Sequence, residues 1–328
     1  MTSQLLLFAL FAGCLILANR DASMFADAEN YSEYFDAVGL GHEINAEPSF
    51  VFIADFVNSI NLDVAGLFFI YLLLSLFLKG AFFILKMPNH LHISLLYFTS
   101  YFIVHDLVQI RIGAALGVAL WAVFLLGEKK LWASLFLWLF AFSLHFSSLL
   151  LAILSILLYV AENNKVSLSF VRYIASINMI IGTTLLLGAY FWNLSFILLL
   201  TNLLSDTSVI PQRYIENYID SGGVVGFEKI IYSFTLGISA VYALYKRMLA
   251  GFMATHAAVS MTFAFLILVA FKDMPVIGSR FADILLFFTP FLVFGVYREN
   301  KILGQILFLW ILFVQSINLI FFSKVIFI

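Results

Sequence analysis

The sequence predicts an all-α integral membrane protein with about 11 transmembrane helices, some of them short, on the evidence of composition, hydropathy and run length. Hydrophobic residues make up 63% of the 328 residues and charged residues only 11%, whereas a soluble domain keeps roughly a quarter of its residues charged. The mean hydropathy is +1.06. A net charge of −2 gives no indication of a nucleic-acid partner.

The apolar residues fall into runs that approach the length needed to cross a bilayer, about 20 residues and roughly 17 at the short end. Several are short, which suits tilted or buried helices. In chain order, the clearest runs are 4–18, 64–85, 91–104, 112–126, 170–190, 229–245, 254–271, 281–297 and 302–322.

The uncharged segment 131–160 is interrupted by polar residues around His145, so it is either one long helix or two short ones. Cytoplasmic loops carry an excess of Lys and Arg. With a cytoplasmic N-terminus, two helices here place most basic residues, Lys79 among them, on the inner side. A single helix abolishes that bias. We therefore expect a helical hairpin with His145 at the outer surface.

The resulting topology gives one membrane domain, 1–328, with two large outer segments. The first, 19–63, is polar and acidic. The second, 191–227, begins with an apolar stretch that is too short to span and is expected to lie in the membrane interface. The inner loops are short, so we expect the chemistry to face outward.

Three arginines, Arg111, Arg213 and Arg280, fall on the outer side, each at or near the mouth of a span. A guanidinium there is costly without an anion, and its planar fork suits phosphate. Arg111 and Arg280 are each expected to open a helix, where the dipole also favours an anion. The three predict a lipid-linked diphosphate site. The alternatives are snorkelling or pairing with Asp106 for Arg111, pairing with Asp283 for Arg280, and a solvated loop residue at 213.

His145 is a candidate for proton transfer because the ordinary pKa of histidine, about 6.5, suits it. We expect it to be buried without an acid neighbour; its alternative is a structural side chain bonded to nearby serines. Asp27 and Glu29 in the acidic segment could hold a divalent metal, or are simply solvated. Four outer tyrosines are placed to stack on sugar rings: Tyr31, Tyr34, Tyr214 and Tyr218.

The order of these motifs resembles the EpsG/Wzy-like polysaccharide polymerases over about 27–297. The matching segments are Asp27…Tyr31…Tyr34…Glu47-Pro48-Ser49-Phe50, Gln109-Ile-Arg111-Ile-Gly-Ala-Ala, Phe142-Ser-Leu-His145-Phe-Ser-Ser, Arg213-Tyr214…Tyr218 and Arg280. The chain departs from the family at Ser49, where glycine is usual, and at Ile112-Gly113, where a more polar pair is expected.

The resemblance implies a GT-C-like membrane glycosyltransferase of the bacterial inner membrane. It would join undecaprenyl-diphosphate-linked repeat units into O-antigen, capsule or exopolysaccharide at the outer face. A chain-length regulator is a further partner that the resemblance suggests. His145, or an acid (Glu47 or Asp27), would act as base, and the arginines would neutralise the leaving diphosphate without a metal cofactor. A flippase or transporter of lipid-linked sugars and an O-antigen ligase are the alternatives. The sequence contains no Walker A loop, HExxH or GxSxG motif, which disfavours an ATP-driven pump or a hydrolase of those types.

Overall fold

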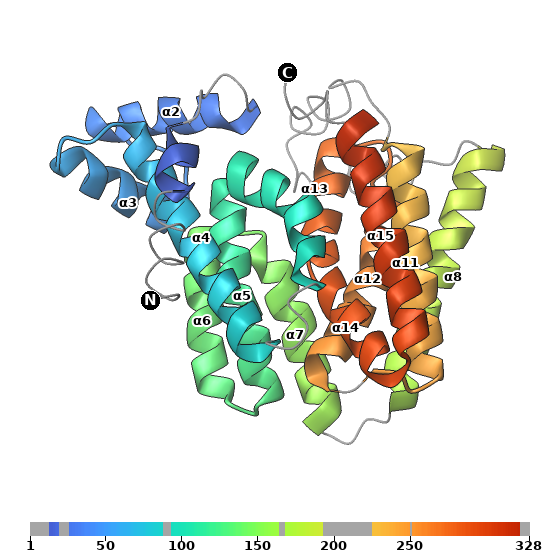
Figure 1. Ribbon diagram of the computed structural model, residues 1–328. Coiled ribbons are helices and arrows are strands. Elements are labelled where there is room, and N and C mark those ends of the chain that lie inside the picture. The colour runs from blue at the N-terminus through green and yellow to red at the C-terminus, as the bar shows by residue number, and fades with distance from the viewer. Residues whose placement is uncertain are drawn as a thin grey trace, which may run out of the picture. The chain divides into compact units, whose positions relative to one another are not determined.

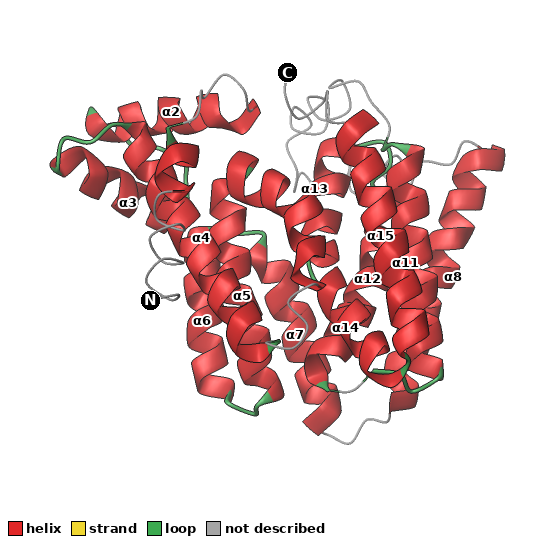
Figure 2. Cartoon of the chain, in the orientation of Figure 1, coloured by secondary structure: helices red, strands yellow, loops and turns green. Residues whose placement is uncertain are grey.

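The structure is a computed structural model that describes residues 13–19, 26–87, 93–163, 168–192, 225–249 and 251–321. These residues form helices joined by short turns and include no strand, which confirms the all-α class (Figure 2). Two compact units are formed, one by 1–153 together with 306–328 and the other by 154–305, so that α7 (Ser148–Asn163) and α15 (Lys301–Phe321) are each divided between them.

The first unit is built around α5 (Ile110–Gly127), which packs against α4, α6 and η3 and is buried along most of its length. Small residues on α5 allow this close approach, as expected for helices packed within a membrane. The short helices α2 and α3 lie together at one end of this bundle (Figure 1). The other helices of this unit are α2 (Ala26–Gly39), α3 (Pro48–Ser59), α4 (Val64–Lys86), the π-helix η3 (Tyr97–Val108) and α6 (Leu131–Leu144).

The second unit is built around α12 (Phe252–Ala270), whose side chains are mostly buried against four other helices. Its buried polar group His256 bonds Ser155 of α7, with 2.8 Å between Nε2 and Oγ. The helices that pack on α12 are α8 (Leu168–Trp192), α11 (Phe227–Tyr245), α13 (Pro275–Leu286) and α14 (Thr289–Glu299).

Six helical segments among the described residues are long and apolar enough to cross a membrane, and three apolar helices are shorter. The chain is therefore a multi-pass membrane protein, while the count of about 11 spans stays a prediction. The six segments are Val64–Lys86, Ile110–Gly127, Leu168–Trp192, Phe227–Tyr245, Phe252–Ala270 and Pro275–Glu299.

The expected hairpin in 131–160 is present as two helices, α6 and α7, which meet at His145. His145 has an extended backbone (φ −161°, ψ 126°) and ends α6. The division of this segment into two helices is confirmed, whereas their arrangement as two spans that turn at the outer surface stays a prediction.

Two other expectations were wrong in detail. The span expected at 91–104 ends too early, because the π-helix η3 runs from Tyr97 to Val108. Lys79, counted among the basic residues of the inner side, lies within α4 and is 1% exposed. The span expected at 281–297 falls within the candidate span Pro275–Glu299, in which Pro290 in the first turn of α14 favours a new helix start.

Candidate functional site

The carboxylate of Glu47 binds two of the residues singled out in the sequence, Arg111 and His145. One oxygen, Oε1, lies 2.5 Å from His145 Nδ1, and the other, Oε2, accepts a hydrogen bond from Arg111 Nη1. Glu47 is only 4% exposed, whereas the side chains of Arg111 and His145 retain 16% and 21% exposure. The site therefore consists of a buried carboxylate held between two partly exposed basic side chains, those of Arg111 and His145.

Each of the three residues stands at a helix end, which is where the local sequence places it. Glu47 has an extended backbone and precedes Pro48, which starts α3 because proline suits the first helical turn. Its side chain makes no capping bond to α3, so both carboxylate oxygens are available to Arg111 and His145. Arg111 is the second residue of α5. Helix ends thus bring together residues far apart in the sequence.

Ser49 joins the two segments that carry Glu47 and His145. Its hydroxyl donates to the backbone carbonyl of Ser143 at 2.7 Å, and its Oγ lies 3.4 Å from the hydroxyl oxygen of Tyr71. Ser49 follows Glu47 by two residues, and Ser143 precedes His145 by two. The hydroxyl that replaces the family's usual glycine therefore fixes the distance between the acid and the imidazole, a contact that glycine could not make.

Aromatic rings cover the guanidinium of Arg111. Its Cζ lies 5.0 Å from the ring centroid of Tyr31 and 5.3 Å from that of Phe50, within the range of cation–π attraction. Tyr31 is 5% exposed, so a sugar ring could stack on it only after the side chain moved. Tyr34, at 36% exposure, is the more accessible of the two and packs edge-on against Phe50.

Arg111 and His145 keep the carboxyl group of Glu47 ionised. Burial alone would raise the pKa of Glu47, but the hydrogen bond with His145 and the positive charge of Arg111 outweigh it, and the pKa lies below its ordinary value. An ionised carboxylate only accepts hydrogen bonds. His145 therefore presents a protonated Nδ1 to Glu47, and its Nε2 has no hydrogen-bond partner among the described residues. The expectation that His145 lacks an acid neighbour was wrong.

The pairing of Arg111 with Asp106 that the sequence offered was also wrong. Asp106 bonds Lys79 rather than Arg111, with 2.7 Å between Nζ and Oδ1. Asp283 forms an ion pair with Lys229, with 2.8 Å between Nζ and Oδ2. Arg280 lies within α13, which already begins at Pro275, so the argument from a helix N-terminus does not apply to it.

The remaining candidates lie away from the Glu47 carboxylate or outside the described residues. Asp27 and Glu29 are in the first turn of α2, and Asp27 is one turn before Tyr31 on the same face. Among the described residues, no group of three or more His, Cys, Asp or Glu side chains is arranged to hold a metal ion. Arg213, Tyr214 and Tyr218 lie outside the described residues.

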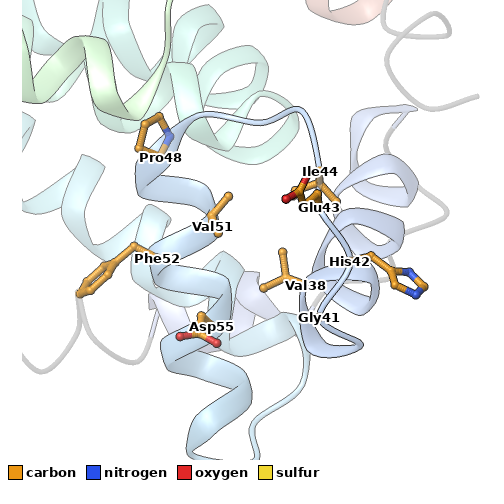
Figure 3. A pocket seen from close by; sticks show the side chains of 9 residues that line it. All are labelled: Val38, Gly41, His42, Glu43, Ile44, Pro48, Val51, Phe52 and Asp55. Carbon is orange, nitrogen blue, oxygen red and sulfur yellow. The ribbon is translucent and has the colours of Figure 1, made fainter.

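An open groove of about 760 Å³ lies between α3 and the segment that joins it to α2 (Figure 3). Val38 and Val51 point into it, whereas Phe52 and His42 point away. The groove lies on the face of α3 turned away from the buried Phe50, so it is separate from the cluster at Glu47. Its lining residues are Val38, Gly41, His42, Glu43, Ile44, Pro48, Val51, Phe52 and Asp55.

Sequence reasoning identified Glu47, Arg111 and His145 singly but missed that they form one cluster. It also missed the contacts that Ser49, Phe50 and Tyr71 make around this cluster. The one available signal was Ser49, because a hydroxyl at a position where glycine is usual indicates an added side-chain contact.

A search of curated proteins and of solved structures found no match to the chain. A family model does match: the model described as the EpsG family aligns with residues 4–327, nearly the whole chain. The match extends over the helices that carry the Glu47, Arg111 and His145 cluster and over the second unit as well. The chain belongs to the EpsG family.

Proposed function

We propose that this protein is a membrane glycosyltransferase that polymerises oligosaccharide repeat units carried on undecaprenyl diphosphate, at the outer face of the bacterial inner membrane. The observation that carries the proposal is the Glu47–His145 pair, in which a buried, ionised acid orients an imidazole whose other nitrogen has no hydrogen-bond partner in the part of the chain that the structure describes. Family membership supports the same class of reaction. The product would be O-antigen, capsule or exopolysaccharide.

His145 acts as the general base in this proposal. A hydroxyl of the incoming repeat unit attacks the anomeric carbon of the growing chain, and the new carbon–oxygen bond replaces the bond to the lipid diphosphate. The hydroxyl proton passes to Nε2 of His145. Glu47, bonded to Nδ1, stabilises the imidazolium that forms, as a carboxylate does in the triads of other enzymes. His145 and Glu47, which the sequence offered as rival bases, thus act as one unit; Asp27 is the remaining alternative base.

The leaving diphosphate needs positive charge as the bond to the sugar breaks. Arg111 is placed to supply part of it, because its side chain is partly exposed and lies beside the base, although Glu47 already offsets some of its charge. Arg280, exposed on α13, and Arg213 in the second outer segment are the further proposed ligands. Tyr34, Tyr214 and Tyr218 are proposed to stack on sugars.

A metal-free reaction is part of the proposal, since arginines carry the charge of the leaving group. Purified enzyme in EDTA should keep its activity. Loss in chelator with recovery in Mg²⁺ or Mn²⁺ would instead make Asp27 and Glu29 candidate metal ligands.

The polymer made by a deletion strain tests the reaction itself. A strain that makes O-antigen should accumulate single repeat units on lipid A-core when the polymerase is lost. Absence of any O-antigen on the core would indicate a ligase or a flippase instead. In vitro extension of a lipid-linked repeat unit by purified protein, without lipid A-core, then separates polymerase from both alternatives.

A further inference from the structure

A second pair of opposite charges, Lys79 and Asp106, is buried inside the first unit. Nζ of Lys79 lies 2.7 Å from Oδ1 of Asp106, and the two residues are each 1% exposed. Lys79 is near the middle of α4, a candidate membrane span, and Asp106 is in the last turn of η3. Ionisable residues at such positions are costly and most often serve a function.

The surrounding groups hold this pair in one arrangement. Ser75 donates a hydrogen bond to the same oxygen of Asp106, and Lys79 Nζ lies 3.2 Å from the hydroxyl of Tyr97. The Lys79 ammonium also lies 4.9 Å from the Tyr97 ring centroid. Because the contacts join α4 to two separate turns of η3, they fix the position of η3 against the core of the unit.

Gly113 connects this pair to the first turn of α5. A Cβ atom added to Gly113 would lie 2.5 Å from Asp106 Oδ1 and 2.3 Å from the backbone oxygen of His105, so α5 and η3 touch at van der Waals distance here. The position of Asp106 therefore sets the position of the α5 first turn, which carries Arg111.

We propose that Lys79 and Asp106 are positioning residues that fix the first turn of α5, so that Arg111 reaches Glu47 and Glu47 in turn orients His145. The pair acts through helix placement and touches neither substrate nor the reacting atoms. The inference rests on the proposed function for its effect on rate, but its effect on the geometry of His145 is independent of which reaction the site performs.

Variants at Lys79, Asp106 and Gly113 test the proposal, because they separate the loss of a buried charge from the displacement of a helix. Asp106→Asn leaves Lys79 as a buried charge with a neutral partner, which destabilises the fold. Lys79→Met combined with Asp106→Leu removes both charges and is expected to insert and fold. That double variant should still misplace Arg111, because η3 is no longer held to α4. Gly113→Ala keeps both charges and pushes α5 away from η3.

The test uses the full chain, purified in detergent and labelled with ¹⁵N-histidine. The His145 signal is assigned by its loss in His145→Gln. Arg111→Gln supplies the reference position of this signal when Glu47 no longer bonds a guanidinium. We expect the Lys79→Met/Asp106→Leu variant and Gly113→Ala to move the His145 Nδ1 signal toward the Arg111→Gln position. Ser155→Ala, which removes a buried polar contact of the second unit, should leave it unchanged.

Polymerisation rates complete the test. A displacement of about 1 Å at a reacting group costs up to roughly 10²-fold, so kcat should fall about 10- to 100-fold in the two positioning variants. A folded double variant with the wild-type His145 signal overturns the proposal. If the signal moves as expected while wild-type protein shows no polymerase activity, the positioning role stands and the proposed function fails.

Discussion

Glu47 and His145 should behave as one catalytic unit, and a double-mutant cycle measures this directly. The perturbations are Glu47→Gln, His145→Ala and the two combined. Gln keeps the size of the Glu47 side chain and an acceptor oxygen but removes the negative charge that stabilises a protonated imidazole. His145→Ala removes the base itself.

The magnitude follows from the roles assigned to the two residues. Loss of a general base typically costs about 10²–10⁴ in rate, which corresponds to about 2.7–5.4 kcal/mol of transition-state stabilisation. We expect His145→Ala to reach this range and Glu47→Gln to fall within a factor of about 10 of it. Because residues that act as a unit are non-additive, the combined variant should be no slower than His145→Ala alone.

The assay is extension of a lipid-linked repeat unit by purified protein, with product length resolved on a gel. The effect should be in kcat, since neither change removes a group proposed to bind the substrate. Asp55→Asn is the matched control, because it also converts a carboxylate to an amide on the same short helix, at an exposed position. Additive losses, or normal polymer from Glu47→Gln, would refute the coupling of the two residues.

Four further predictions concern the support of the site and its place in the membrane. Arg111→Lys should retain less than about a tenth of the wild-type kcat, because lysine lacks the planar fork that bonds Glu47 and stacks on the rings of Tyr31 and Phe50. A wild-type rate in this variant would show that only the charge matters. Ser49→Ala should cost about 1 kcal/mol of stability through the lost bond to Ser143, measured by thermal unfolding in detergent, and unchanged stability would contradict the role of that hydroxyl. Since the folded pKa of Glu47 lies below its ordinary value of about 4.5, its ionised form stabilises the fold above that pH, and this contribution is lost as pH falls through the folded pKa. Tm should therefore drop in acid, and less so in Glu47→Gln; equal acid sensitivity of the two proteins would remove Glu47 as the cause. Cysteine placed at Ser147 should react with an impermeant reagent from the outer face, and labelling only from the inner face would invert the predicted topology.

The helical class and the break at His145 could be predicted because each follows from local composition. Apolar runs require helices in a membrane, since every backbone group must be bonded internally. The partners of charged groups could not be predicted in this way. Asp106 lies five residues from Arg111 and is a natural neighbour by sequence, yet its carboxylate bonds Lys79 on another helix. Glu47 is 64 residues from Arg111 and 98 from His145. Pairings over such distances depend on how helices pack, which hydropathy does not encode.

The arrangement of charges in the first unit has a physical reason beyond catalysis. An ionised group withdrawn from water must find its opposite charge nearby, so Arg111 and Lys79 each lie beside a carboxylate in the same region of the bundle. The two pairs differ in what surrounds them. Lys79 and Asp106 are fully enclosed, which suits a fixed support, whereas Arg111 and His145 keep part of their side chains exposed. The proposed transfer of a proton beside a leaving diphosphate needs this difference, because the outer groups must contact substrate while the groups that hold them stay in place. The buried pair is therefore expected to tolerate replacement only by a combination that preserves helix placement, whereas Arg111 is expected to need both its charge and its planar fork.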